Sequence, residues 1–439
     1  MLTTFVNAFK IKDVRNKILI TIGLLFIYRL GCHIPVPGIQ TWEGLGDYTY
    51  LQIMNAVSGG ALSMGTFFAM GIGPYINASI IIQLLSVGIP ALERLSKQGE
   101  EGRKKINAYT RMLTLVLAIA QAIGILVSFD NAGALVHAQL FGEGAKFFNY
   151  ALLVLIYTAG AALTMWLGER ITDYGVSNGI SMLIFAGILS TAGNAILGLF
   201  ENIFNPIGAN KTEQALASQE AVWTLIIFLV SAIIIFGAIV FVNDGERKIN
   251  VQYAKQVKGR KMYGGQSTHI PIKVNGSGVM PLIFAFSILS FPDLVMNIIG
   301  VKSSDTWWGR NVGTGTWVYM VLLCVLILFF AYFYNQIQFN PDDISKSIQG
   351  NGGFIPGTRP GKPTADYLRR VSNRITLFGA IFLALIALIP SLIFKAIGGD
   401  ALVNVFSATG LLIIVSVSLE FDQALQSQIM MKNYKGFLK

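Results

Sequence analysis

The chain has 439 residues, of which 53% are hydrophobic and only 13% are charged, and its formal net charge is +10. Soluble domains carry about 25% charged residues, so this composition excludes an ordinary soluble protein and predicts that most of the chain lies in lipid. The two cysteines, Cys32 and Cys324, are isolated, which gives no support to a disulfide framework or a metal site. We therefore expect no metal and no cofactor.

Apolar windows bounded by charged residues or by Gly and Pro clusters predict ten membrane spans. We place them at residues 18–36, 67–89, 109–129, 147–168, 178–199, 221–242, 277–299, 316–337, 374–394 and 402–421. Because the number of spans is even, both termini are expected on the same side of the membrane.

The distribution of Lys and Arg selects that side. All but six of the 33 basic residues fall in the amino-terminal arm, the carboxy-terminal tail or connections on the side of the termini. The six on the other side are Arg29, Lys146, Lys211, Lys302, Arg310 and Lys395. The positive-inside bias then predicts a multi-pass protein of the cell membrane with both termini in the cytoplasm.

Residues 55–89 consist of two unlike halves. The first, which we call the Gly-rich segment (residues 55–66), is too polar and short to cross a bilayer, whereas residues 67–89 are long enough to span. Gly71, Gly73 and Pro74 lie where the second helix could begin or bend. Irregular backbone at membrane depth is tolerated only where protein or water covers it, so a half-inserted segment predicts a cavity within a helix bundle.

Three isoleucines follow at helical spacing. Ile72, Ile76 and Ile80 are four residues apart and share one helix face. That face lines the cavity, or it packs against other helices or meets lipid, and periodicity alone favours the second interpretation.

The ten spans divide into five and five around a weakly polar link at residues 201–220. With an odd number of spans in each half, the halves must lie inverted relative to each other, and inverted pairs build a site at their interface. We expect an all-α polytopic membrane protein, one domain overall, with residues 1–200 (spans 1–5) and 201–439 (spans 6–10) as its two inverted halves.

Ionisable side chains are scarce within the spans. Asp293, beside Pro292, is the main exception, and buried charges usually mark proton relays and ion sites. Ser58 and Ser63 have no histidine in an apolar span to activate them, so an intramembrane hydrolase is not favoured and both serines are interpreted as structural. We do not expect an enzyme.

Two long connections, residues 243–276 and 338–373, exceed what a turn between spans requires. In the first, Val, Tyr and Ile alternate with polar residues on both sides of Gly259, which is typical of a hairpin. The second is rich in Gly around Pro356 and Pro360. Long loops with clustered charge are usually functional, and these are suited to RNA phosphates or an acidic protein face. The alternative is that they only set the topology.

A series of short motifs, in a fixed order along almost the whole chain, resembles the SecY family, the central subunits of the bacterial protein-conducting channel. The motifs include Tyr28-Arg29-Leu30-Gly31, Ser58-Gly59-Gly60-Ala61-Leu62-Ser63, Gly73-Pro74-Tyr75-Ile76-Asn77, Gln266-Ser267-Thr268-His269-Ile270-Pro271 and Phe354-Ile355-Pro356-Gly357-Thr358-Arg359-Pro360-Gly361.

The resemblance implies an hourglass channel that translocates unfolded preproteins and releases apolar segments sideways. Its plug matches the Gly-rich segment, in particular Asn55, Ser58, Gly59, Gly60, Ala61, Leu62 and Ser63. Its hydrophobic pore ring falls on Ile72, Ile76, Ile180, Ile184, Ile283 and Ile413, and we place Gln83 at its lateral gate. Its positions that contact the ribosome or the SecA motor fall on Arg260, Lys261 and Arg359.

The partners that the resemblance implies are small subunits resembling SecE and SecG, the SecA motor ATPase, the ribosome through its rRNA phosphates, preproteins with signal sequences, and membrane lipids. The alternative function is an inverted-repeat secondary transporter of a small solute. A transporter predicts a polar site at the midplane, whereas these spans supply isoleucines and almost no charges.

Overall fold

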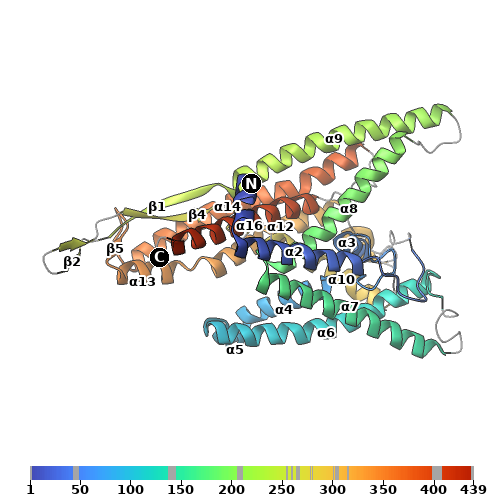
Figure 1. The fold of residues 1–439 in the computed structure, drawn as a ribbon, viewed down its shortest axis with the longest axis horizontal. Coiled ribbons are helices and arrows are strands. Elements are labelled where there is room, and N and C mark those ends of the chain that lie inside the picture. Colours follow the sequence, from blue (N-terminus) through green and yellow to red (C-terminus); the bar gives the residue numbers. More distant parts are fainter. Residues whose placement is uncertain are drawn as a thin grey trace.

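The protein is described by a computed structural model that is mainly helical (Figure 1). It describes residues 2–42, 49–136, 145–204, 211–253, 256–258, 261–263, 267–276, 278, 280–299, 301, 306–313, 316–397 and 408–436. Its helices are α1 Leu2–Lys10, α2 Lys12–Gly31, α3 Thr49–Ser58, α4 Gly73–Gly88, α5 Pro90–Lys97, α6 Glu100–Asn131, α7 Lys146–Tyr174, α8 Gly179–Phe204, α9 Lys211–Asn243, α10 Met280–Ile299, α11 Trp307–Val312, α12 Trp317–Gln338, α13 Pro341–Gly350, α14 Lys362–Ile397 and α16 Ala408–Gly436.

A long helix coincides with each predicted span, namely α2, α4, α6, α7, α8, α9, α10, α12, α14 and α16. By length and apolarity alone, six helices of the described residues can cross a membrane, or seven if α4 and α5, which are bent by 106°, count as one span. The shorter apolar helix α10 and α2, which carries Arg15, Lys17 and Arg29, do not pass that test. The chain is a mostly helical polytopic membrane protein, as predicted.

The span predicted at residues 67–89 opens with non-helical residues, and its helix begins at Gly73, one of the positions that the sequence indicated. Residues 59–72 form turns, and α4 begins at Gly73 with Pro74 in its first turn. Gly71, with φ of 51°, adopts the left-handed conformation that side-chain-bearing residues avoid, so a helix cannot run through it. Proline is favoured in a first helical turn because its missing N–H is not needed there. The irregular stretch is therefore longer than the sequence indicated.

Helix pairing follows the same order in both halves. In the first half α2 contacts α7 and α8, while α4, α6, α7 and α8 pack in chain order. In the second half α9 contacts α14 and α16, while α10, α12, α14 and α16 pack in chain order. The halves meet where α6 contacts α10 and where α8 contacts α9 and α16. Equivalent helices occupy equivalent places, which fits two inverted five-helix halves.

A small antiparallel sheet projects from one end of the bundle (Figure 1). Strand β1 (Glu246–Tyr253) pairs with β4 (Ser267–Lys273), and β2 (Gln256–Lys258) pairs with β3 (Lys261–Tyr263) beyond them. The predicted hairpin is confirmed. Strand β5 (Gly353–Phe354), from the second long connection, pairs with the other edge of β1, which the sequence did not indicate. The strands share a core of Ile249, Val251, Ile272, Ile348, Ile355 and Leu368 with α13 and α14.

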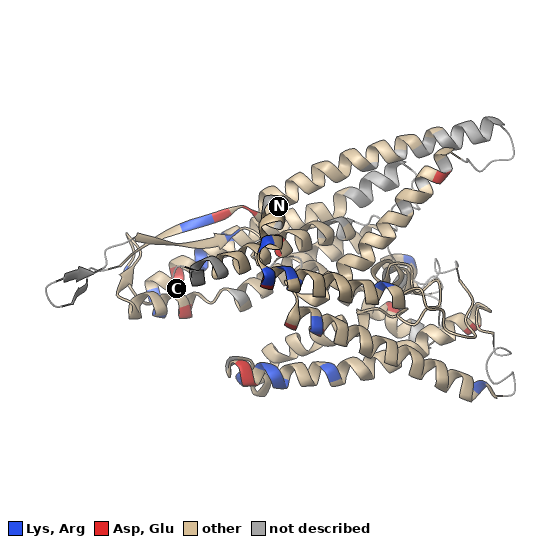
Figure 2. Ribbon diagram, viewed as in Figure 1, with Lys and Arg blue, Asp and Glu red and all other residues tan. Residues whose placement is uncertain are grey.

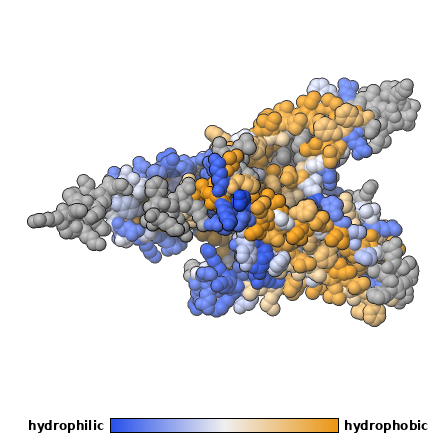
Figure 3. Space-filling model, in the orientation of Figure 1, coloured by the Kyte–Doolittle hydropathy of each residue, from blue (hydrophilic) through white to orange (hydrophobic). Residues whose placement is uncertain are grey.

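Charge and hydropathy separate along the bundle. Lys and Arg gather at the end that bears the strands and α5; the C-terminus lies on that side, and the N-terminus lies near the middle of the view (Figures 1 and 2). Away from this basic end, hydrophobic residues cover the surface of the helical bundle (Figure 3). The molecule thus has an apolar body with one polar, basic end.

Backbone packing at Gly160 yields the first testable prediction. A Cβ at Gly160 of α7 would lie 2.1 Å from the carbonyl oxygen of Phe67, whereas a Cβ at Gly198 of α8 would meet nothing within 4 Å. We expect Gly160→Ala to lower the free energy of unfolding by about 1–3 kcal/mol, because the two backbones must move apart. The loss is measured as a lower melting temperature in detergent. Gly198→Ala is the control and should stabilise by about 0.5–1 kcal/mol, since Ala favours helix. Equal stability of Gly160→Ala and the unaltered chain would contradict this packing.

Candidate functional site

Six isoleucines from four elements meet in one apolar cluster. Ile72 immediately precedes α4 and Ile76 lies within it, Ile180 and Ile184 lie on α8, Ile283 lies on α10, and Ile413 lies on α16. Ile72, Ile184 and Ile413 are buried in this cluster, and the other three pack against it half-buried. The members come from both halves, so the cluster lies where the halves meet.

Glycine keeps the neighbouring helix close to this cluster. A Cβ at Gly168 of α7 would lie 3.7 Å from Ile180 Cγ1 and 3.8 Å from Ile72 Cδ1. The Ile72 side chain is held between helices and does not face lipid. Periodicity left open whether Ile72 and Ile76 line a cavity or pack against other helices. The structure is compatible with both interpretations, because the two residues pack against other helices where the halves meet.

The Gly-rich segment is the end of a short helix followed by tight turns. Asn55 organises it, because its carbonyl oxygen accepts from Gly60 N at 2.9 Å and its Oδ1 accepts from Ser63 N at 2.9 Å. Ser58 and Ser63 donate their hydroxyls to the carbonyl oxygens of Asn55 and Gly60 at 3.1 and 2.9 Å. Both serines thus make local structural bonds.

Two apolar residues of the segment enter the protein interior. Ala61 is buried in the cluster that holds the isoleucines, and Leu62 is fully buried in a neighbouring cluster with Met54 and Leu294 of α10. Helix α3 packs against α8 and α10, one from each half. The Gly-rich segment therefore caps the isoleucine cluster and touches both halves.

Gln83 forms a polar link across the seam between the halves. Its Nε2 donates to Ser79 Oγ at 3.1 Å on its own helix, α4, and its Oε1 accepts a short hydrogen bond from the hydroxyl of Tyr334 in α12. The Tyr334 ring packs edge-on against Phe284 of α10, with centroids 4.9 Å apart. Buried Ile80 and half-buried Leu84 of α4 join the same apolar cluster of the second half. At this level the seam is closed.

The seam closes at a second level through α6 and α10. Leu294 of α10 is buried among Leu126 and Phe129 of α6. Asp293 is buried next to it, so this carboxyl group lies within the protein and not in lipid. Two contacts, one polar and one apolar, thus hold together the helices that border the seam.

Two of the three basic residues predicted for docking, Lys261 and Arg359, lie in the described part of the polar end. Arg359 is exposed in the turn between β5 and α14, and its carbonyl oxygen accepts from Thr364 Oγ1 at 2.7 Å. Lys261 begins β3, while Arg260 lies outside the described residues. Because β5 joins β1, the structure brings the connection that carries Arg359 onto the same sheet as the hairpin.

Comparison with known proteins decides the family. The SecY family model matches residues 66–421. The protein translocase subunits SecY of Mycobacterium bovis and Corynebacterium glutamicum are 41% and 42% identical over 459 and 466 residues, and each match covers all of both chains. The chain belongs to the SecY family.

The fold agrees with solved structures of this family. A structure concerned with the plug domain of a SecY protein has a TM-score of 0.65 and 20% identity, and Sec61 in a canine ribosome–channel complex has a TM-score of 0.61 and 18% identity. Both matches cover 94% of this chain and 92% of the other. As a SecY channel subunit, this multi-pass membrane protein has a non-catalytic role in protein translocation.

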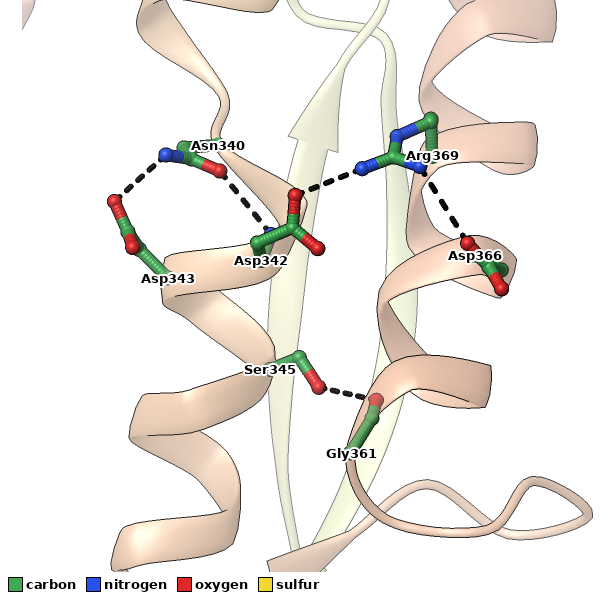
Figure 4. Close-up of polar contacts among 7 residues, drawn as sticks. All are labelled: Asn340, Asp342, Asp343, Ser345, Gly361, Asp366 and Arg369. Carbon is green, nitrogen blue, oxygen red and sulfur yellow. Dashed lines mark hydrogen bonds and ion pairs between the residues drawn. The ribbon is translucent and has the colours of Figure 1, made fainter.

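Polar contacts join α13 to the start of α14 at the basic end of this SecY subunit (Figure 4). Asn340 caps α13, and Arg369 of α14 contacts Asp342 at 2.8 Å and Asp366 at 3.5 Å. Ser345 Oγ donates to the carbonyl oxygen of Gly361 at 2.7 Å. These contacts fix the turn of Arg359 between α13 and α14.

Sequence reasoning missed Tyr334. The apolar run at residues 316–337 contains three tyrosines, Tyr319, Tyr332 and Tyr334, and nothing local distinguishes them. Tyr332 instead reaches the carbonyl oxygen of Asn373 on α14 at 3.4 Å. A polar group opposite Gln83 was the signal to search for, since a polar side chain in a membrane bundle pairs with a partner.

The seam contact yields a prediction that a double-mutant cycle tests. We expect Gln83→Leu and Tyr334→Phe to show a coupling free energy of about 0.6 kcal/mol, and less than about 2 kcal/mol, which is the range for hydrogen bonds between membrane helices. Unfolding in mixed micelles measures it. Tyr332→Phe is the matched control and should not couple to Gln83→Leu. Additive effects of the Gln83 and Tyr334 variants would contradict a direct bond.

Proposed function

We propose that the six isoleucines form the pore ring through which this SecY subunit passes unfolded polypeptides, with the Gly-rich segment as its plug. The observation that carries this proposal is the convergence of isoleucines from both halves on one cluster, with Ala61 of the Gly-rich segment against it. We place the division between the halves at residues 200 and 201. The resting state is closed.

The chemistry of the ring suits this task. A narrow apolar constriction opposes ions because water leaves it, and it presents neither a charge nor a hydrogen-bonding group that would hold a passing peptide. Branched isoleucine side chains close around substrates of different widths. The polar side chains of the Gly-rich segment, Asn55, Ser58 and Ser63, make hydrogen bonds within their own segment.

The seam between α4 and α6 on one side and α10 and α12 on the other serves as the lateral gate. Its polar contact between Gln83 and Tyr334 is worth little in a membrane protein, about 0.6 kcal/mol on average. An arriving apolar segment replaces the apolar contacts of Ile80 with its own side chains. Opening this seam therefore costs little and releases the segment to lipid.

The basic end, which carries Lys261 and Arg359, is the docking surface for a motor of the SecA kind or for the ribosome. Arg260, which lies outside the described residues, is assigned to this surface from the sequence alone. A homologous Sec61 channel is described in a complex with the ribosome, which supports this part of the proposal. Small membrane subunits resembling SecE and SecG bind the two halves on the side opposite the lateral gate and hold them together. The protein lies in the cell membrane with both termini in the cytoplasm, a placement supported by the excess of Lys and Arg in the termini and in the connections predicted on their side.

Single-channel conductance in planar bilayers tests the proposed pore. We expect the intact complex to be nearly silent and a variant that lacks residues 56–63 to conduct large ion currents, because the deletion removes Ala61 and Leu62 from the interior. Met64→Ala, which shortens an exposed side chain just beyond the deletion, is the control and should stay silent. Silence of both forms, with saturable carriage of a small solute, would replace the channel by a transporter.

A charge reversal tests the docking surface. We expect Arg359→Glu to weaken binding of the complex to ribosomes or to the motor about tenfold at low salt, and less at high salt, where charge contacts are screened. Lys105→Glu, at an exposed position of α6 near the same end, is the control and should change binding less. Binding measured by cosedimentation at several salt concentrations decides between a specific contact and general attraction; equal effects would contradict a contact at Arg359.

A further inference from the structure

Arg29 connects three elements around the Gly-rich segment. It lies in the last turn of α2, half-buried. Its Nη2 donates to Ser190 Oγ of α8 at 2.5 Å, and its Nη1 approaches the carbonyl oxygen of Ser58, the last residue of α3, at 3.5 Å. A Cβ at Gly59 would lie 2.4 Å from the same Nη1, so the guanidinium lies directly over the backbone of the Gly-rich segment.

The segment also docks on α8 beside this arginine. Thr191 Oγ1 donates to the carbonyl oxygen of Ala56 at 2.9 Å. A Cβ at Gly187 would lie 1.8 Å from the carbonyl oxygen of Val57, so the two backbones touch at that point. Gly187, Ser190 and Thr191 form one face of α8, since residues three and four apart are neighbours on a helix. The end of α3 therefore rests on a polar cradle that Arg29 completes.

Electrostatics favours a cation at this place. The last carbonyl groups of a helix have no partner within the helix, and they carry the negative end of the helix dipole. Hydrogen bonds from a charged donor are about twice as strong as neutral ones. Within the described residues the guanidinium contacts two neutral groups, the carbonyl of Ser58 and the hydroxyl of Ser190, so these contacts can be broken without leaving a buried carboxylate unpaired.

We infer that Arg29 is the latch of the plug: its guanidinium holds the Gly-rich segment closed, and its release is a step separate from opening of the lateral gate. The inference rests on the proposed function. Arg29 and its α8 partner both belong to the first half, so movement of the second half takes Leu294 out of the cluster that it shares with Leu62 but leaves the latch in place. When the seam opens, the plug therefore stays in place until the contacts of Arg29 with Ser58 and Ser190 break.

The test measures single-channel currents of the purified complex in KCl. We expect Arg29→Met to raise the open probability at least tenfold. Arg29→Lys should rise less, because an ammonium reaches one acceptor but lacks the planar fork of arginine. In a chain that also lacks residues 56–63, Arg29→Met should add nothing, because the segment on which the latch acts is gone.

Two further variants serve as a control for the lost charge and as a second test of the Arg29 contact. Lys146→Met removes an exposed cation at the same end of the bundle and should stay silent. Ser190→Ala removes one acceptor of Arg29 and keeps its charge; we expect about a threefold rise in open probability. Ser190→Ala carries the test if Arg29→Met fails to assemble, and no rise in it would then overturn the latch.

The outcomes separate the latch from the pore. If the deletion conducts while Arg29→Met stays silent, the latch is wrong and the plugged pore stands. If Arg29→Met raises currents by the same factor with and without residues 56–63, the residue acts elsewhere and the latch is also wrong. If the deletion itself is silent, the proposed pore fails and the latch fails with it.

Discussion

Backbone polar groups that lie at membrane depth must find partners inside the protein, because lipid supplies none. Residues 59–72 are not helical, so this constraint acts on them most strongly. The stretch that follows α2 answers it: Phe67 N donates to the carbonyl oxygen of Ile34 at 2.9 Å, Val36 N to that of Gly65 at 3.0 Å, and Trp42 N to that of Ser63 at 2.8 Å. The helices around this pair of irregular segments exclude lipid from it, and the isoleucine cluster lies beneath.

Much of this arrangement is readable in the sequence because it depends on transfer to lipid and on local turn chemistry. Apolar windows located the ten long helices, and alternation around Gly259 located the hairpin. The start of α4 shows the limit. Phe67 to Met70 are apolar enough to continue the helix, and only the positive φ of Gly71 shows that they do not. Hydropathy measures the medium that surrounds a residue, not the conformation of its backbone.

Contacts between distant segments were beyond sequence reasoning. Gln83 could be placed at the seam, but its partner on α12 depends on how two helices rotate against each other. Arg29 was noted as a charge near the end of the first span, whereas its bonds to Ser58 and Ser190 join residues 29 and 161 positions apart. Strand β5 has two residues, which is too short for any periodic pattern to indicate a strand.

The two halves resemble each other in helix pairing but differ in what they carry. Strand β5 binds the connection between α13 and α14 to the hairpin that joins α9 and α10, and a Cβ at Gly379 of α14 would lie only 2.4 Å from the carbonyl oxygen of Val274 at the hairpin's base. The sheet therefore joins the two long connections of the second half, and a force applied to the strands acts on both of them. No strand from the described part of the first half shares the sheet. The second half thus carries the strands, whereas the Gly-rich segment belongs to the first half, so the two are separated by the interface between the halves.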